Sequence, residues 1–200
     1  MLHHDKDLDI KLYIVHNTAV PRTQVPLQLE SVDNFHREKD WGGGWKQPHP
    51  SELGYYVGYN LFTEGTGETT QCRVIGEETI ANKGHNCAGS NDCDAISHCF
   101  AGYFKVEDMT AMQVQELREG FLEAKAIYPD IRIVQHSDVQ PGRTCAELST
   151  PWLEALVAEP TKETKNQIIA RLTKENMKLK EQVKQLIGFV TSLIKRILNK

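Results

Sequence analysis

The 200-residue sequence contains no apolar run that approaches the roughly 18 residues of a membrane-spanning helix. Its first residues, MLHHDKDLDIK, are charged and lack the apolar stretch of a secretory signal. An excess of basic residues is also missing, since the formal net charge is -4, and no nucleic acid is expected as a partner. We therefore expect a protein made in the cytoplasm without an export signal of its own. Its length suits one domain, or one domain with an appendage.

Cysteines are few and odd in number. The five are Cys72, Cys87, Cys93, Cys99 and Cys145, so they do not form a complete disulfide framework. Cys87 and Cys93 lie close enough in sequence to close a small loop in an oxidising compartment. Because no export signal is present, free thiols are the favoured interpretation.

Short segments rich in Tyr, Val, Ile and Phe, bounded by turn residues, indicate strands. They lie at 11–17, 55–63, 69–76, 97–104 and 131–136. Helical patterns are present at about 25–39, 110–127 and 146–158, the second with Asp108 or Thr110 as its N-cap. The Gly-rich and Pro-rich segments 42–54 and 64–68 indicate surface loops. This alternation predicts an α/β fold, with a mixed central β-sheet flanked by helices.

The composition changes near residue 159, where Glu159-Pro160 ends a helix and glycine becomes nearly absent. We therefore predict a domain over 1–158 and a C-terminal helical coiled-coil extension over 159–200. Apolar residues recur there at spacings of three and four, with β-branched residues and one Asn at heptad position a and Leu at position d. The a positions are Ile169, Asn176, Val183, Val190 and Ile197, and the d positions are Leu172, Leu179, Leu186 and Leu193. This pattern favours a parallel two-stranded coiled coil, hence a homo-oligomer formed through 165–199.

Other arrangements of this C-terminal helix stay open. An amphipathic helix folded back on its own domain has a similar pattern. The last third carries a wider apolar face, including Ile187 and Phe189, together with the cations Lys195 and Arg196. Such a composition also suits contact of the helix with a membrane surface. The wider face is equally compatible with a trimer or tetramer.

Two stretches far apart in the chain together supply three metal-binding side chains. Segment 14–19 (IVHNTA) is a strand that ends on a histidine, and segment 134–145 (VQHSDVQPGRTC) runs from a strand into a Gly/Pro turn. The side chains are His16, His136 and Cys145. Two imidazoles and one thiolate, with a fourth position open, are typical of a catalytic Zn2+ site rather than a structural one. The sequence therefore predicts a zinc hydrolase.

Four short motifs follow one another along the chain: VHNTA, FHREKDW, LGYY and HSDVQPGRTC, beginning at residues 15, 35, 53 and 136. They resemble the zinc-dependent N-acetylmuramoyl-L-alanine amidases of the bacteriophage-lysozyme and peptidoglycan-recognition-protein type. The first resembles that family's first-ligand strand, and the second its WHxxxGW helix end. The third resembles the start of its GYH strand, and the fourth its second and third ligands. Order and spacing agree over roughly residues 10–157, and segment 84–102 matches more loosely.

The resemblance implies a peptidoglycan hydrolase that cleaves the amide between N-acetylmuramic acid and L-alanine through a zinc-activated water. It makes His16, His136 and Cys145 the zinc ligands. Tyr55 falls on the family's catalytic tyrosine, which helps to orient or deprotonate the attacking water. Arg143 falls where the phage enzymes carry a lysine, and a cation there would stabilise the developing oxyanion.

The sequence also departs from the family pattern. Arg143 keeps the charge of the family's lysine but changes its reach and hydrogen-bond geometry. Tyr56 replaces the usual His of GYH, and Ala146 stands where the family often has Pro. Segment 42–53 is longer than the family's connection, and the coiled coil is no part of the amidase pattern.

The resemblance also suggests a biological setting. A missing export signal fits a phage endolysin that stays in the host cytoplasm until it is released to the cell wall. The alternative is a peptidoglycan-binding recognition protein without catalysis, because some relatives lose the third ligand and bind without cutting. Retention of Cys145 and Tyr55 favours the enzyme. If assembly through the coiled coil were the main function, the three-ligand set would be left unexplained.

Overall fold

The computed structural model describes residues 8–38, 50–76, 79, 94–140 and 142–158. The predicted coiled coil at 165–199, Trp41 of the second motif, and Cys87 and Cys93 lie outside the described residues. Within them, no helix combines the length and the apolar character needed to cross a membrane.

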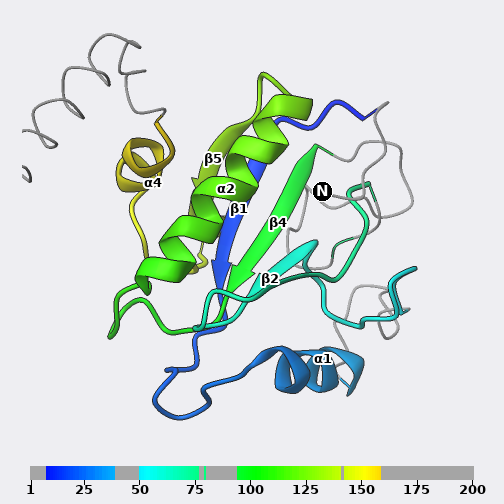
Figure 1. Cartoon of the computed structure of the whole chain (residues 1–200), viewed down its shortest axis with the longest axis vertical. Helices are drawn as coiled ribbons and strands as arrows, with labels where there is room; N and C mark the ends of the chain where they lie inside the picture. The colour runs from blue at the N-terminus through cyan, green and yellow to red at the C-terminus, as the bar shows by residue number, and fades with distance from the viewer. Residues whose placement is uncertain (1–7, 39–49, 77–78, 80–93, 141, 159–200) are drawn as a thin grey trace, which may run out of the picture. The chain divides into compact units, whose positions relative to one another are not determined.

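A mixed sheet forms the centre of the described part of the chain (Figure 1). Its five strands lie in the order β3-β2-β4-β1-β5. Neighbours β2, β4, β1 and β5 run parallel, and β3 pairs antiparallel with β2. The strands are β1 (Leu12–Asn17), β2 (Leu61–Thr63), β3 (Thr69–Gln71), β4 (Ala95–Phe100) and β5 (Arg132–Gln135). The predicted α/β fold with a mixed sheet is confirmed.

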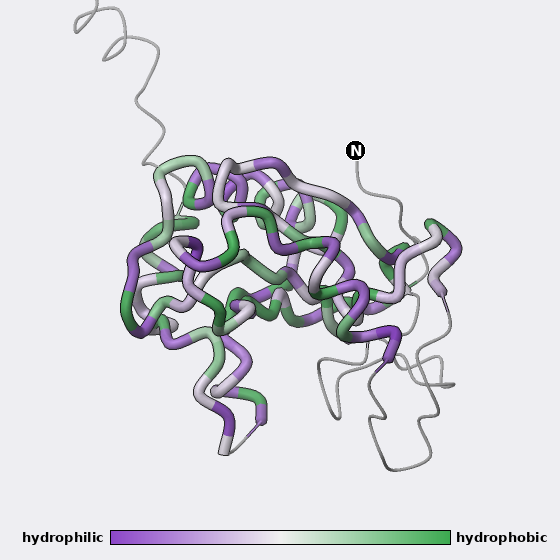
Figure 2. The backbone as a smooth tube through the Cα atoms, turned by 90° about the horizontal axis from the view of Figure 1, so that it is seen from below, coloured by the Kyte–Doolittle hydropathy of each residue, from purple (hydrophilic) through white to green (hydrophobic). Residues whose placement is uncertain are grey.

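Side chains alternate between the two faces of the sheet, as strand geometry requires. On one face, residues such as Tyr13 and Phe100 pack with Phe121 of α2 (Ala111–Ile127) and Leu153 of α4 (Thr150–Val157). On the other face, Phe62 and its neighbours pack against α1 (Leu29–Glu38). Figure 2 shows hydrophobic segments, in green, passing through the middle of this described unit.

Side-chain caps fix where the helices begin. The Thr110 hydroxyl accepts the N–H of Gln113, whose side chain accepts the N–H of Thr110, so Thr110 is the N-cap of α2. Ser149 accepts the N–H of Trp152, and α4 therefore begins later than the predicted residue 146. The buried carboxylate of Glu64, just after β2, accepts the N–H of Leu29 at 2.7 Å and ties the start of α1 to the sheet.

Several strand predictions were too long. The prediction over 55–63 is wrong for residues 55–60, which have no ladder and bend into β2. Of the strand predicted over 69–76, only β3 is formed. The strand predicted over 97–104 corresponds to β4, which ends before the turn at Gly102 (φ 141°). His136 does not end β5 but begins a short helix, α3 (His136–Val139).

Candidate active site

The parallel strands β1 and β5 bring the two predicted histidine ligands together. His16 lies near the carboxyl end of β1, beside Cys99 of β4 in the sheet register. His136 is the first residue after β5. Because β1 and β5 are parallel neighbours, their carboxyl ends lie at the same edge of the sheet. The ring centroids of the two histidines are 4.5 Å apart.

Cys145 completes a compact group of possible metal ligands. One ligand atom from each of His16, His136 and Cys145 lies within 4.8 Å of the others. The Cys145 sulfur is 3.7 Å from Nδ1 of His16. In a tetrahedral zinc site, bonds of about 2.3 Å to sulfur and 2.0–2.1 Å to nitrogen place these two atoms about 3.6 Å apart. The three side chains therefore fit a zinc ion.

Neighbouring side chains orient both imidazoles. The amide oxygen of Gln140, one turn along from His136, lies 2.7 Å from His136 Nε2. A carbonyl oxygen only accepts, so the proton of His136 sits on Nε2 and Nδ1 carries the lone pair that a metal needs. The hydroxyl of Ser97 lies 3.4 Å from His16 Nε2, on the side of the ring away from Cys145. The Gln140 bond leaves Nδ1 of His136 free to bind a metal, and Nδ1 is the ring nitrogen of His16 that lies 3.7 Å from the Cys145 sulfur.

Burial favours the uncharged forms of Cys145 and His136. It raises the pKa of the Cys145 thiol to about 11, although the N–H of Asn17, 3.2 Å from the sulfur, acts in the opposite direction. It also lowers the pKa of His136, so that imidazole stays neutral at pH 7, as a metal ligand must. A bound divalent cation would favour the thiolate form of Cys145.

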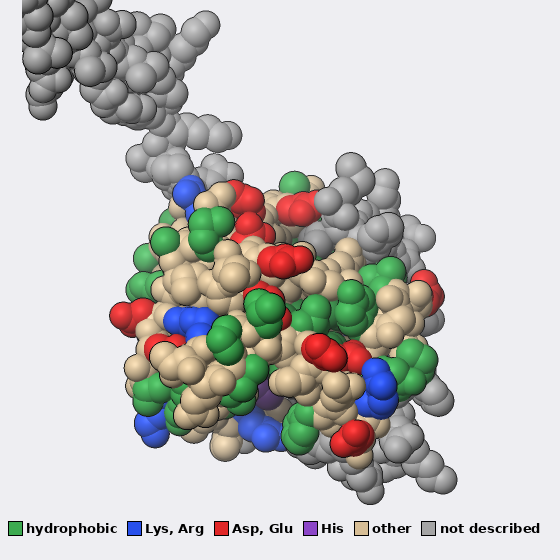
Figure 3. Space-filling model, turned by 60° about the horizontal axis from the view of Figure 1, so that its bottom comes forward, with side chains coloured by type: hydrophobic (Ala, Val, Ile, Leu, Met, Phe, Trp, Pro, Cys, Tyr) green, Lys and Arg blue, Asp and Glu red, His purple; other side chains and the backbone are tan. Residues whose placement is uncertain are grey.

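Arg143 lies in the exposed turn between α3 and Cys145, where its N–H donates to the carbonyl of Gln140. Burial is the larger influence on the pKa values of His136 and Cys145, and the positive charge of Arg143 acts to lower both. In the view of Figure 3, the visible histidine surface is a small recessed area next to a basic side chain. A catalytic role for Arg143 stays a prediction.

The tyrosine in ring contact with His16 is Tyr59, not the predicted Tyr55. The Tyr59 and His16 centroids are 5.0 Å apart, and His36 of α1 packs on Tyr59 at 5.5 Å. Burial raises the pKa of the Tyr59 hydroxyl far above its usual value, while the nearby charge of Arg143 opposes this shift. Tyr55 lies four residues earlier, in a loop where its N–H and C=O bond to Ser51.

A sequence signal for Tyr59 exists. The dipeptide Gly-Tyr occurs at both 54–55 and 58–59, and only the second directly precedes Asn60 and strand β2. The expectation of a strand beginning at Tyr55 favoured the first copy. Residues 55–60 form no strand pairing, and the strand that follows them is β2. In the GYH motif quoted above, Gly-Tyr stands at the start of a strand, so Gly58-Tyr59 matches that motif better than Gly54-Tyr55.

No protein-family model matches the sequence, and no curated protein matches it. Solved structures do match. N-acetylmuramoyl-L-alanine amidase LysC from Clostridium intestinale URNW is 17% identical with a TM-score of 0.52, over 76% of this chain and 87% of that chain. The Ph2119 endolysin from Thermus scotoductus MAT2119 bacteriophage Ph2119 is 20% identical with a TM-score of 0.52, over 75% and 86%. Human PGRP-IBETAC, in complex with glycosamyl muramyl pentapeptide, is 16% identical with a TM-score of 0.52, over 74% and 83%.

The chain has the fold of these amidases and recognition proteins. The resemblance drawn from the four sequence motifs is thereby confirmed at the level of the fold. Enzymes and recognition proteins share this fold, so the chemistry has to be argued from the residues of the site.

Proposed function

We propose that the chain is a peptidoglycan hydrolase, a zinc-dependent N-acetylmuramoyl-L-alanine amidase. The observation that carries this proposal is the convergence of His16, His136 and Cys145 within 4.8 Å at one edge of the sheet. Tyr59 packs against the first of these residues, and the exposed Arg143 lies two residues before Cys145. The fold shared with LysC and the Ph2119 endolysin supports the same activity.

The donor set suits zinc in particular. Two imidazole nitrogens and one thiolate leave a fourth position for water or substrate. Zinc held by these residues would polarise the scissile carbonyl and lower the pKa of water towards neutrality. The hydrogen bonds that His16 makes with Ser97 and that His136 donates to Gln140 hold the two rings in place.

Two further side chains have distinct roles in this proposal. The hydroxyl of Tyr59 is protonated at neutral pH, as an ordinary tyrosine is, and burial raises its pKa further, so it both donates and accepts hydrogen bonds. It is suited to orienting the attacking water rather than to removing its proton. Arg143 is exposed and always charged, and it stabilises negative charge that develops on the amide oxygen. In this proposal, Tyr59 takes the role first assigned to Tyr55.

A peptidoglycan-binding protein without catalysis is the second candidate. It is favoured by the similarity to human PGRP-IBETAC, which was solved with a muramyl pentapeptide. The two candidates differ in what happens to insoluble cell wall. The zinc-loaded full chain should first bind purified peptidoglycan and then release soluble fragments. Stable binding without release, in a sample shown to contain zinc, would favour the recognition protein.

A further inference from the structure

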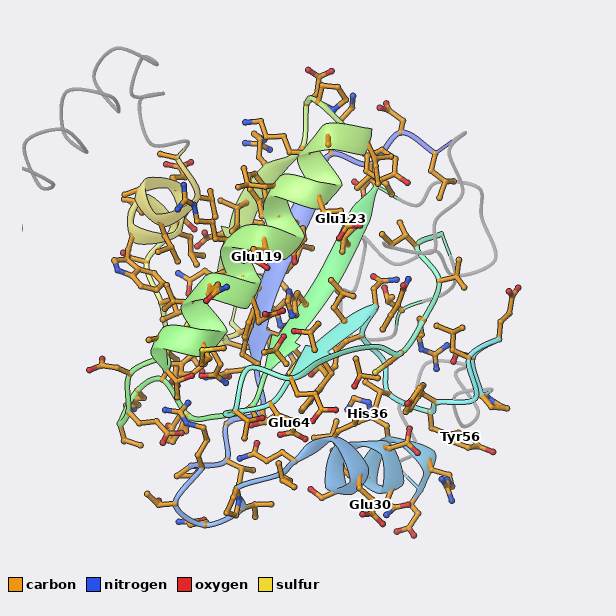
Figure 4. All side chains as sticks on the ribbon, viewed as in Figure 1. Glu30, His36, Tyr56, Glu64, Glu119 and Glu123 are labelled. Atoms are coloured by element: carbon orange, nitrogen blue, oxygen red, sulfur yellow. The ribbon has the colours of Figure 1, made fainter. Side chains whose placement is uncertain are left out.

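The main-chain N–H groups of the three residues before Tyr59 donate to side chains and not to a neighbouring strand. Asp33 Oδ1 accepts the N–H of Tyr56 at 2.6 Å and the N–H of Val57 at 3.1 Å. His36 Nδ1 accepts the N–H of Gly58 at 2.9 Å. Asp33 and His36 lie three residues apart on α1, so both can face the same segment. In Figure 4, His36 lies on the side of α1 that faces the strands.

Arg73 satisfies the carbonyl groups of the same segment. Its Nε donates to the Val57 carbonyl at 2.5 Å, and its NH2 group lies 3.5 Å from the Tyr56 carbonyl. The arginine is only 4% exposed. Burying a guanidinium is costly unless it is hydrogen-bonded, and here part of its donor capacity goes to the main chain. Asp33 therefore binds the N–H groups of Tyr56 and Val57, while Arg73 binds their C=O groups.

The residue after Tyr59 is anchored as well. The side-chain amide of Asn60 donates to the Val74 carbonyl at 3.2 Å, and its oxygen accepts the N–H of Ser97 on β4 at 2.9 Å. Tyr59 thus lies between two fixed neighbours. Its ring packs between His36 and His16. A small displacement of the main chain of 56–58 would therefore also displace the ring and hydroxyl of Tyr59.

We propose that Asp33 and Arg73 are positioning residues: they clamp the backbone of 56–58 and thereby set Tyr59 against His16. Neither needs to touch the substrate. The catalytic consequence rests on the proposed amidase function, whereas the clamp itself does not. A displacement of about 1 Å in a catalytic group can cost on the order of 10²-fold in rate. Loss of the clamp should therefore lower kcat while leaving the metal ligands in place.

The test compares Asp33→Ala with Asp33→Asn in the full chain. Alanine removes the acceptor for both N–H groups, whereas asparagine keeps a carbonyl oxygen in the same position. Glu30→Ala, at an exposed position on the same helix, is the matched control. Hydrogen exchange at the amides of Tyr56 and Val57 should speed up by about 10-fold or more in Asp33→Ala and stay near wild type in the other two. Unchanged exchange in Asp33→Ala would overturn the clamp.

A double-mutant cycle tests whether the clamp acts through Tyr59. We expect Asp33→Ala to lower kcat by roughly 10-fold to 100-fold, with KM and zinc content little changed. In a Tyr59→Phe background, the same substitution should have almost no further effect, because the hydroxyl it positions is gone. An equal loss in both backgrounds would overturn the positioning role.

Arg73→Lys and Arg73→Met extend the test from the other side of the segment, and they replace Asp33→Ala if that variant does not fold. Arg73→Lys keeps a charged donor group, whereas Arg73→Met has none. The lysine variant should therefore keep more of the wild-type protection from hydrogen exchange, and a higher kcat, than the methionine variant. Equal behaviour of the two variants would contradict the clamp. If the wild-type chain shows no amidase activity, the proposed function fails, and the exchange measurements alone still decide the clamp.

Discussion

The ring of Tyr59 lies 5.0 Å from the ring of His16, centroid to centroid, although the two residues are 43 positions apart in sequence. This contact joins the segment held by α1 to the metal-ligand edge of the sheet. It also identifies Tyr59 as a tyrosine whose ring packs against one of the proposed ligands. Burial raises the pKa of the same tyrosine, and the positive charge of Arg143 opposes that rise.

Removing the hydroxyl of Tyr59 and removing that of Tyr55 should therefore have different effects on kcat. Tyr59→Phe should reduce kcat by about 10²-fold while zinc content is unchanged, since the hydroxyl proposed to orient water is lost and the three proposed ligands are kept. Tyr55→Phe should leave kcat within about 2-fold, because the hydrogen bonds that tie Tyr55 to Ser51 use its main-chain N–H and C=O, which phenylalanine keeps. Steady-state kinetics on a soluble muramyl peptide would measure both. A large loss in Tyr55→Phe alone would restore the assignment made from the sequence.

Gln140 should control metal affinity without being a ligand. Its amide oxygen holds the proton of His136 on Nε2. Gln140→Ala removes this bond, and zinc affinity should fall by about 10-fold to 100-fold. Competition with a chromophoric chelator would measure the change. Gln115→Ala, at an exposed position on α2, is the control and should bind zinc like the wild type.

His98 should make the domain sensitive to acid. It is fully buried, with Nδ1 bonded to Tyr13 and Nε2 bonded to Thr63, each at 2.6 Å. Burial lowers its pKa to about 3, whereas an unfolded chain has a pKa near its ordinary value of 6.5. Below about pH 6.5, His98 takes up a proton in the unfolded chain but stays neutral in the folded protein, which shifts the equilibrium towards unfolding. The contribution of neutral His98 to the free energy of unfolding is therefore complete above about pH 6.5 and is lost as the pH falls towards 3.

Urea unfolding of the wild type and of His98→Gln between pH 7 and pH 4 would measure this effect. The free energy of unfolding of the wild type should fall more steeply, by up to about 1.4 kcal/mol per pH unit, than that of the variant. The difference between the two proteins removes the contribution of the carboxylates. Parallel curves would mean that His98 does not titrate as its burial predicts.

The C-terminal segment gives a separate prediction, which rests on the heptad pattern alone. By light scattering, the full chain should be an oligomer, most simply a dimer, and a truncated chain that ends at Glu159 should be a monomer. Both should cut a small soluble substrate equally well. A monomeric full chain that binds anionic vesicles would instead favour membrane-surface contact.

The sequence was sufficient to predict that His16, His136 and Cys145 come together, because His16 and His136 lie at or just after the ends of buried strands. Parallel strands bring such ends together, and the Gly/Pro turn returns the chain to Cys145. The same reasoning missed Tyr59. Segment 55–60 has the composition of a strand, but Asp33, His36 and Arg73 satisfy its backbone in place of a ladder. Hydrophobic periodicity does not reveal side-chain-to-backbone bonds of this kind, which depend on α1 packing nearby.

The most direct test of the central claim is the chemistry of the ends that are released when the zinc-loaded full chain digests purified peptidoglycan. We predict new L-alanine amino termini without new reducing sugar ends. The activity should disappear in Cys145→Ser together with most of the bound zinc, because one of the three ligands is replaced by a poor one. New reducing ends, or undiminished release of L-alanine termini by a zinc-free Cys145→Ser protein, would contradict the assignment of a zinc amidase.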